Sequence, residues 1–306
     1  KARWLKYMKC NNNSPRRLLG IVVLWLLVCS NSFAEMWKLD IPIKEAKQET
    51  EIFKPNTRYT QSCEGDLDQI VIKQNTKAYL NNNKMSLISE IIFDLDEYGQ
   101  FKVSHDSKIN SKGKLTKSKI KDDYTPGSTK LSKKELNQAR KLLKDATKTN
   151  VSYFNIIYGN KFIPGKQLNT DLGKEALKLV KNYLKILFEA EGADLNILKK
   201  FYKKLKVDIY IDYLGSAEID AEKFYVVNFK TEMQYVGNDL GFKQFMQEYS
   251  ETAEHVTYMF VHVPSGYYNF NVQYENSEEQ GELNMICTIY KDNQEIVEVD
   301  ISEYLN

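Results

Sequence analysis

The stretch Leu205–Tyr213, LKVDIYIDY, sets the fold class of this chain. Apolar side chains stand at every second position, with Lys206 and Asp208 between them, and this is the period of a strand with one buried face. Tyr225–Met233 repeats the pattern a short distance further on. The two runs predict half-buried strands of one sheet.

The strand pattern extends from this pair in both directions. Strands begin near Ile70, and Glu97-Tyr98-Gly99 predicts a hairpin turn. Val256–Val263 is apolar at both parities, which favours a central strand covered on both faces. Residues 268–274 and 283–299 complete a meander, and strands joined by short turns are antiparallel.

Helical spacing of apolar residues appears between the strands. It predicts helices over about 133–147, 171–191, 195–205 and 240–250, the first opened by a capping box at Ser132 and Glu135. We therefore expect an α+β fold. In it, a curved antiparallel β-sheet, a meander resembling a half-barrel, is covered by three to four amphipathic helices.

Residues 1–34 have the composition of a secretory signal peptide. Basic residues precede the apolar run Leu18–Cys29, and the small residues Ser32 and Ala34 follow it. The run of twelve residues is shorter than the roughly 20 that cross a bilayer. We expect cleavage after Ala34 and a single exported domain over 35–306, periplasmic or secreted, with an extended lead-in at 35–65.

The charge of the chain is unevenly distributed. The whole sequence carries net +2, but segment 1–34 holds six of the 43 basic residues and no acidic one, which leaves net −4 for 35–306. This balance gives no reason to expect nucleic acid as a partner. Segment 102–148 alone carries thirteen lysines and Arg140 against five acids, net +9. Its part 104–129 has few apolar residues and reads as an exposed basic loop or a long polar hairpin. Segment 102–148 is either a contact for anionic lipid or polysaccharide, or a solvated face.

Cysteine and acidic residues suggest two further features. Cys63 and Cys287 remain after the signal peptide, and the sequence leaves open whether they form a disulfide. Asp94 and Asp96 begin a segment that partly fits a calcium loop, but Tyr98 and His105 occupy positions where that loop has ligands. An acidic β-turn is the preferred interpretation, with calcium as the alternative.

Catalytic and cofactor motifs are missing from the sequence. It contains no Gly-x-Ser-x-Gly, HExxH, CxxC or glycine-rich phosphate loop, so we assign no catalytic residue and no cofactor. Of the three histidines, only His262 is expected to be buried, as a neutral side chain bonded to a neighbour.

Aromatic residues gather near the central strand and the hairpin after it. They are either an ordinary strand core or the lining of a ligand pocket. The candidate ligand-binding residues are Tyr258, Phe260, His262, Tyr268, Phe270 and Tyr274. Our leading hypothesis is a non-enzymatic, exported envelope protein that binds an apolar or lipid-like ligand or a protein partner. The alternatives are an exported hydrolase with a carboxylate-based site and a surface interaction protein without a pocket.

Overall fold

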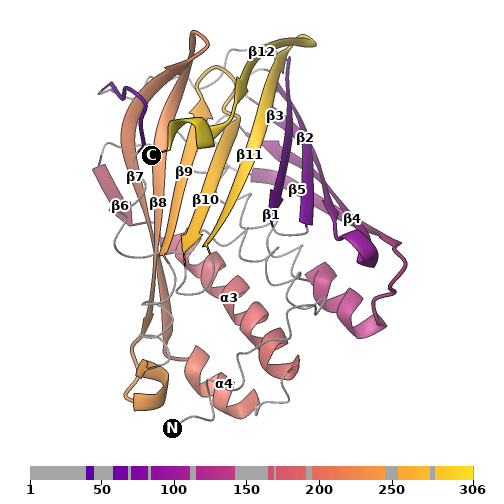
Figure 1. Ribbon diagram of the computed structural model, residues 1–306, viewed down its shortest axis with the longest axis vertical. Coiled ribbons are helices and arrows are strands. Elements are labelled where there is room, and N and C mark those ends of the chain that lie inside the picture. The colour runs from indigo at the N-terminus through magenta and orange to yellow at the C-terminus, as the bar shows by residue number, and fades with distance from the viewer. Residues whose placement is uncertain are drawn as a thin grey trace.

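The computed structural model describes residues 39–44, 58–67, 70–81, 84–110, 115–141, 165–168, 170–190, 195–244, 254–275 and 280–305. The expected signal peptide lies outside these residues. The described chain is mostly antiparallel β-sheet, as the sequence predicts, and the sheet is open (Figure 1).

Strands consecutive in sequence pair as in a meander, except β5 and β6, which lie at opposite ends of the strand order. In chain order they are β1 (Arg58–Leu67), β2 (Ile70–Asn81), β3 (Lys84–Asp94), β4 (Gly99–Ile109), β5 (Leu115–Pro126), β6 (Gly165–Leu168), β7 (Leu205–Ile219), β8 (Glu222–Tyr235), β9 (Glu254–His262), β10 (Tyr268–Glu275), β11 (Gln280–Lys291) and β12 (Gln294–Val299). The order across the sheet is β5-β4-β3-β2-β1-β11-β10-β9-β8-β7-β6, with β12 on β11.

Strand β11 joins the two halves of this sheet. One edge of it pairs with β1 over residues 284–291. The other edge pairs first with β10, over residues 280–284, and then with β12, over residues 287–291. The 3₁₀ helix η3 (Ile301–Tyr304) follows β12 and contacts both β10 and β11. The C-terminal segment therefore occupies the place that β10 leaves along β11.

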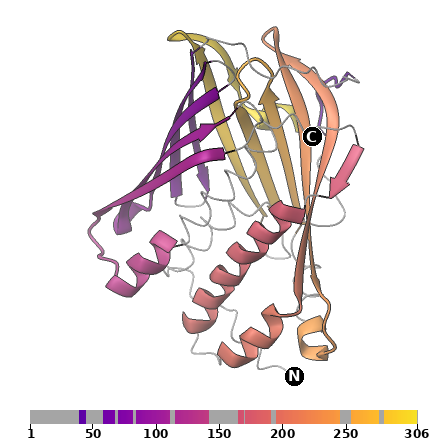
Figure 2. The ribbon, with the colours of Figure 1, turned by 180° about the vertical axis from the view of Figure 1, so that it is seen from behind.

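Helix α3 (Thr170–Ala190) lies against β7. Figure 2, which shows the molecule from behind, gives the clearest view of this helix. Its buried side chains Leu172, Ala176 and Val180 follow helical spacing. Gly173 allows a close approach, since a Cβ at this position would lie 2.6 Å from the carbonyl oxygen of Val207. Helix α4 (Leu195–Tyr202) follows, and residues 133–141 and 240–244 are also helical. The continuations expected to 147 and 250 lie outside the described residues.

Two segments expected to lack regular structure contain strands. Residues 104–129, read from the sequence as an exposed loop or a polar hairpin, form most of the β4–β5 hairpin, so the loop interpretation is wrong. The reason is register: His105 and Ser107 continue the buried face begun by Phe101 and Val103, so a polar sequence still alternates inward and outward. The expected lead-in over 35–65 already contains most of β1.

Candidate functional sites

The aromatic residues predicted to bind a ligand lie in the core. Tyr258, Phe260 and His262 share one face of β9, whereas Tyr268 is the register partner of Val261 and so faces the other way. All four side chains are less than one-tenth exposed. The side chains of Phe270 and Tyr274 lie outside the described part of the structure. The four members whose side chains are described are therefore buried, and they do not share one face of the sheet.

His262 is fully buried between a hydroxyl and a carboxylate. Its Nδ1 lies 2.7 Å from Ser265 Oγ, and its Nε2 lies 2.9 Å from Glu222 Oε2. Ser265 Oγ also accepts the backbone N–H of Tyr267 at 3.1 Å. The ring of His262 contacts the rings of Tyr59 and Phe224. Both ring nitrogens are thus satisfied inside the core.

The serine, histidine and glutamate do not form a hydrolase triad. In such a triad Nε2 faces the serine and Nδ1 faces the carboxylate, which is the reverse of the arrangement here. Ser265 is 1% exposed, so its oxygen is closed to a substrate. The group instead ties the β9–β10 turn to the start of β8. Burial is the main reason that the pKa of Tyr59, next to this group, rises to about 12, and the charge of Glu222 adds to it.

A row of buried polar side chains crosses the sheet beside this group. Gln61, Thr76, Ser89 and His105 are successive register partners on β1, β2, β3 and β4, and each is at most 5% exposed. Strand periodicity leads one to expect apolar residues at such inward-facing positions. Because His105 is also buried, the expectation that His262 is the only buried histidine is wrong. His105 is buried because it faces inward on β4, and burial lowers its pKa.

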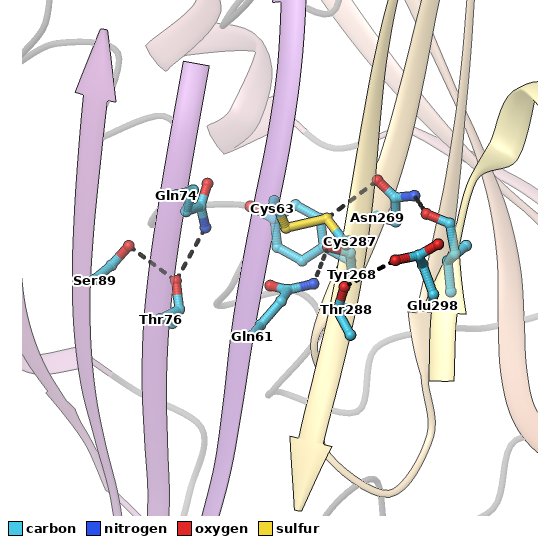
Figure 3. The surroundings of a disulfide bond; sticks show 11 residues. Gln61, Cys63, Gln74, Thr76, Ser89, Tyr268, Asn269, Cys287, Thr288 and Glu298 are labelled. Atoms are coloured by element: carbon cyan, nitrogen blue, oxygen red, sulfur yellow. Dashed lines mark hydrogen bonds between the residues drawn. A yellow bond between two sulfur atoms is a disulfide. The ribbon is translucent and has the colours of Figure 1, made fainter. Parts of the chain in front are cut away.

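Each member of the row has a hydrogen-bond partner, and Figure 3 shows those of Gln61, Thr76 and Ser89. Thr76 Oγ1 lies 3.0 Å from Ser89 Oγ, and Gln61 Nε2 donates to the carbonyl of Tyr268 at 2.9 Å. His105 Nε2 lies 2.9 Å from Ser118 Oγ. Buried polar groups whose hydrogen bonds are all made rigidify a core and favour one arrangement of it. We therefore interpret this row as a feature that fixes the register of the strands.

A disulfide joins Cys63 and Cys287 at the junction of the two sheet halves (Figure 3). The two residues are direct register partners on β1 and β11. Asn269 of β10 lies beside them and donates from Nδ2 to the carbonyl of Val299 at 2.6 Å. The bond therefore lies where β10, β11 and β12 meet.

Asp94 and Asp96, the calcium alternative, lie at the turn between β3 and β4. Asp94 Oδ1 accepts the backbone N–H of Asp96 at 3.2 Å, and η2 (Asp96–Tyr98) follows. Within the described ranges, no group of three or more His, Cys, Asp or Glu side chains is arranged to hold a metal ion. The turn is closed by the Tyr98 N–H, which donates to the Leu95 carbonyl at 3.1 Å.

The described surface is hollowed between the helical residues 133–141 and α3. This cleft has a volume of about 640 Å³. It is lined by Lys133, Lys134, Asn137, Gln138, Lys141, Asn182 and Lys185, which we call the basic cleft. Every one of these side chains carries an N–H donor, and none is acidic. The sequence shows that segment 102–148 is rich in lysine. It does not show that these lysines lie beside Asn182 and Lys185 of α3, because the two helices are far apart in the chain.

Local contacts hold the two walls of the basic cleft in place. Ser132 and Glu135 form the predicted capping box, with the Ser132 N–H donating to Glu135 Oε2 at 2.9 Å and the Glu135 N–H to Ser132 Oγ at 3.3 Å. Arg140 Nε lies 2.8 Å from Asp122 Oδ2 of β5. Across the cleft, Lys141 Nζ donates to Asn182 Oδ1 at 3.0 Å.

The outer face of the β2–β5 half differs from the basic cleft in its charge. Its lysines stand beside acids on neighbouring strands, with Lys73–Glu64 at 2.7 Å and Lys102–Glu90 and Lys117–Asp106 at 2.6 Å. Such exposed pairs contribute little to stability, but they balance the charge of the hairpin. The solvated-face interpretation of segment 102–148 fits the hairpin better than it fits the cleft.

Comparisons of the chain with protein-family models, curated proteins and solved structures found no match. No helix among the described residues is long and apolar enough to cross a membrane. The functional inference therefore depends on the geometry of the described sites.

Proposed function

We propose that this protein is an exported, non-enzymatic binding protein of the cell envelope that holds an anionic ligand in the basic cleft. The observation that carries the proposal is the lining of the cleft, which combines four ammonium groups and three carboxamides with no carboxylate. A lining of this kind offers donors and positive charge to phosphate, sulfate or carboxylate groups.

The dimensions of the cleft favour a compact polyanion. Its volume of about 640 Å³ matches a small-molecule site, and every lining side chain ends in a polar group, while the aliphatic stems supply apolar surface. The lysines act as point charges on flexible stems, which suits several anionic groups on one ligand better than a single planar carboxylate. The lipid-like ligand expected from the sequence fits this site only through an anionic head group.

The rest of the molecule supports a binding role. The open antiparallel sheet, with α3 on β7, is consistent with the curved, helix-covered half-barrel expected from the sequence. In that arrangement the ligand lies in the helical layer. The Cys63–Cys287 disulfide supports export, because disulfides persist in oxidising compartments. The signal-peptide pattern of residues 1–34 also supports export.

Titration calorimetry with tripolyphosphate as the probe tests the proposal. We expect saturable binding that weakens steeply with added salt. The double variant Lys133→Gln/Lys141→Gln should weaken binding at least tenfold, because it removes two of the charges that line the cleft. Both residues are exposed, so the fold should be kept.

The matched control is Lys119→Gln/Lys121→Gln, which removes two exposed lysines from β5. This control should bind as the unmodified protein does. Equal loss in both variants would mean that tripolyphosphate responds to net charge and not to the cleft. Absence of saturable binding would refute the proposal.

A further inference from the structure

The β7–β8 ladder ends in a projection away from the rest of the sheet. Leu205 opposite Tyr235 is the last register pair, and the Val236 N–H donates to the Lys204 carbonyl at 2.8 Å just beyond it. Helix α4 and the helical residues 240–244 lie at this end of the molecule (Figures 1 and 2). The two short helices therefore form one end of the long axis.

An aromatic cluster fixes these helices to each other and to β8. The ring of Phe201 lies 5.5 Å from that of Tyr235 and 4.9 Å from that of Phe242, and the rings of Tyr235 and Phe242 are 5.4 Å apart. Asp239 Oδ1 accepts the Phe242 N–H at 3.0 Å and caps the short helix. The end of the projection is thus a packed structure.

Two apolar side chains point away from this cluster into solvent. Leu240 is 75% exposed and Val236 is 59% exposed, the highest values for large apolar residues in the described part of the chain. Phe242, two positions after Leu240, is partly buried against the core. The chain therefore buries one apolar residue here and presents the other two.

Five exposed lysines lie on the same segments of the projection as the two exposed apolar residues or on the adjoining helix α4. Lys199, Lys200, Lys203, Lys204 and Lys243 are all exposed, and we call them, with Val236 and Leu240, the basic tip. None of these five ammonium groups forms an ion pair with another residue that the structure describes, whereas lysines on the β2–β5 half stand beside acids. The carboxylate of Asp239 is engaged with the helix N-terminus.

We infer that the basic tip docks on an anionic lipid bilayer, with Leu240 and Val236 entering the head-group region and the five lysines facing the lipid charges. Exposed apolar side chains together with several lysines are the composition of interfacial membrane contacts. A soluble polyanion would use the lysines and leave the two apolar side chains in water. The inference stands independently of the basic cleft.

The expected strength follows from both contributions. Each lysine near an anionic surface strengthens binding about fivefold, at about 1 kcal/mol per charge. Burial of a leucine side chain contributes about tenfold or more. The apolar and basic parts should therefore each be measurable in a partition coefficient.

Co-sedimentation with vesicles tests the inference on the mature protein. Vesicles of phosphatidylcholine with about one-third phosphatidylglycerol, a typical anionic mixture, should bind the protein, and pure phosphatidylcholine should bind it far less. Leu240→Ser should weaken partitioning about tenfold, and Lys200→Gln/Lys203→Gln about twenty-fivefold. The controls are Ile88→Ser, which alters an apolar residue 57% exposed on β3, and Lys119→Gln/Lys121→Gln on β5. Both controls should partition as the unmodified protein does.

Four results would overturn the inference. One is no preference for anionic vesicles. Another is a loss in the controls as large as in the tip variants. A third is sensitivity to the lysines but not to Leu240, which would indicate a soluble or polysaccharide polyanion. The fourth is a loss confined to Lys133→Gln/Lys141→Gln, which would assign vesicle binding to the basic cleft.

Discussion

Cys63 of β1 and Cys287 of β11 lie directly opposite each other, with their Cα atoms 4.1 Å apart although they are 224 positions apart in sequence. The short Cα separation is typical of the non-hydrogen-bonded pairs of an antiparallel ladder, where side chains approach most closely. The bond therefore closes nearly the whole described chain into one loop.

Loss of this disulfide should destabilise the protein strongly. For a loop of this length, the chain-entropy model gives roughly 5 kcal/mol. Urea unfolding with and without reductant should show this change as a lower midpoint. The Cys63→Ala/Cys287→Ala variant should unfold at a similarly low midpoint and should not respond to reductant. A midpoint unaffected by reductant in the unmodified protein would show that the bond does not form.

Truncation of His262 should also be costly. His262→Ala leaves Ser265 and Glu222 without their shared partner and opens a hole beside Tyr59, so we expect a loss of about 2–4 kcal/mol. Glu222→Gln retains an acceptor for the ring nitrogen and should cost less than about 1 kcal/mol. Urea midpoints of the two variants provide the comparison. Similar midpoints for His262→Ala and the unmodified protein would show that the buried network contributes nothing to stability.

Burial of His105 should make stability depend on pH. Desolvation lowers its pKa below the usual 6.5, although the nearby charge of Asp106 opposes the shift. The unfolded chain therefore takes up this proton first as pH falls, and stability is lost below about pH 6.5. The urea midpoint should fall between pH 8 and pH 5. His105→Gln, which cannot titrate but can bond Ser118, should show a smaller fall. An equal fall in both proteins would assign the pH dependence to other groups.

Gly173 should resist a substitution that ordinarily stabilises a helix. Glycine to alanine in a helix gains about 1 kcal/mol. Here the added Cβ would meet the Val207 carbonyl oxygen at 2.6 Å, so α3 must move off β7. We expect Gly173→Ala to lower the free energy of unfolding by about 1–3 kcal/mol. The adjacent exposed control, Lys174→Ala, should change it by less than about 0.5 kcal/mol. A stabilised Gly173→Ala variant would mean that α3 does not pack this closely.

Local patterns in the sequence predicted the elements that depend on local periodicity. The alternation in Leu205–Tyr213 and the capping box at Ser132 both act within a few residues, and both features are present in the structure. Local patterns could not decide whether residues 104–129 form an exposed loop or a polar hairpin. His105 and Ser107 are polar yet face inward, and their burial depends on strands that pack against them rather than on their own chemistry.

The candidate sites were harder to predict because they are made by contacts between distant segments. Ser265 lies three residues from His262, but Glu222 lies forty residues away and reaches it only through the pairing of β8 with β9. The basic cleft likewise needs Lys141 beside Asn182, forty-one residues further along the chain. Period-2 and helical patterns carry no information on which elements become neighbours.

The pairing of β1 with β11 has a consequence for the order in which the chain can fold during its synthesis. The meander β1–β5 has only short-range pairings and can form as soon as it emerges. One edge of β1 must nevertheless wait for residues 284–291, which are made more than 200 residues later. Until then β1 presents an open edge, and Cys63 lacks Cys287, with which it forms the disulfide of the folded protein. A chain with this topology therefore keeps its sheet incomplete until β11 has been synthesised.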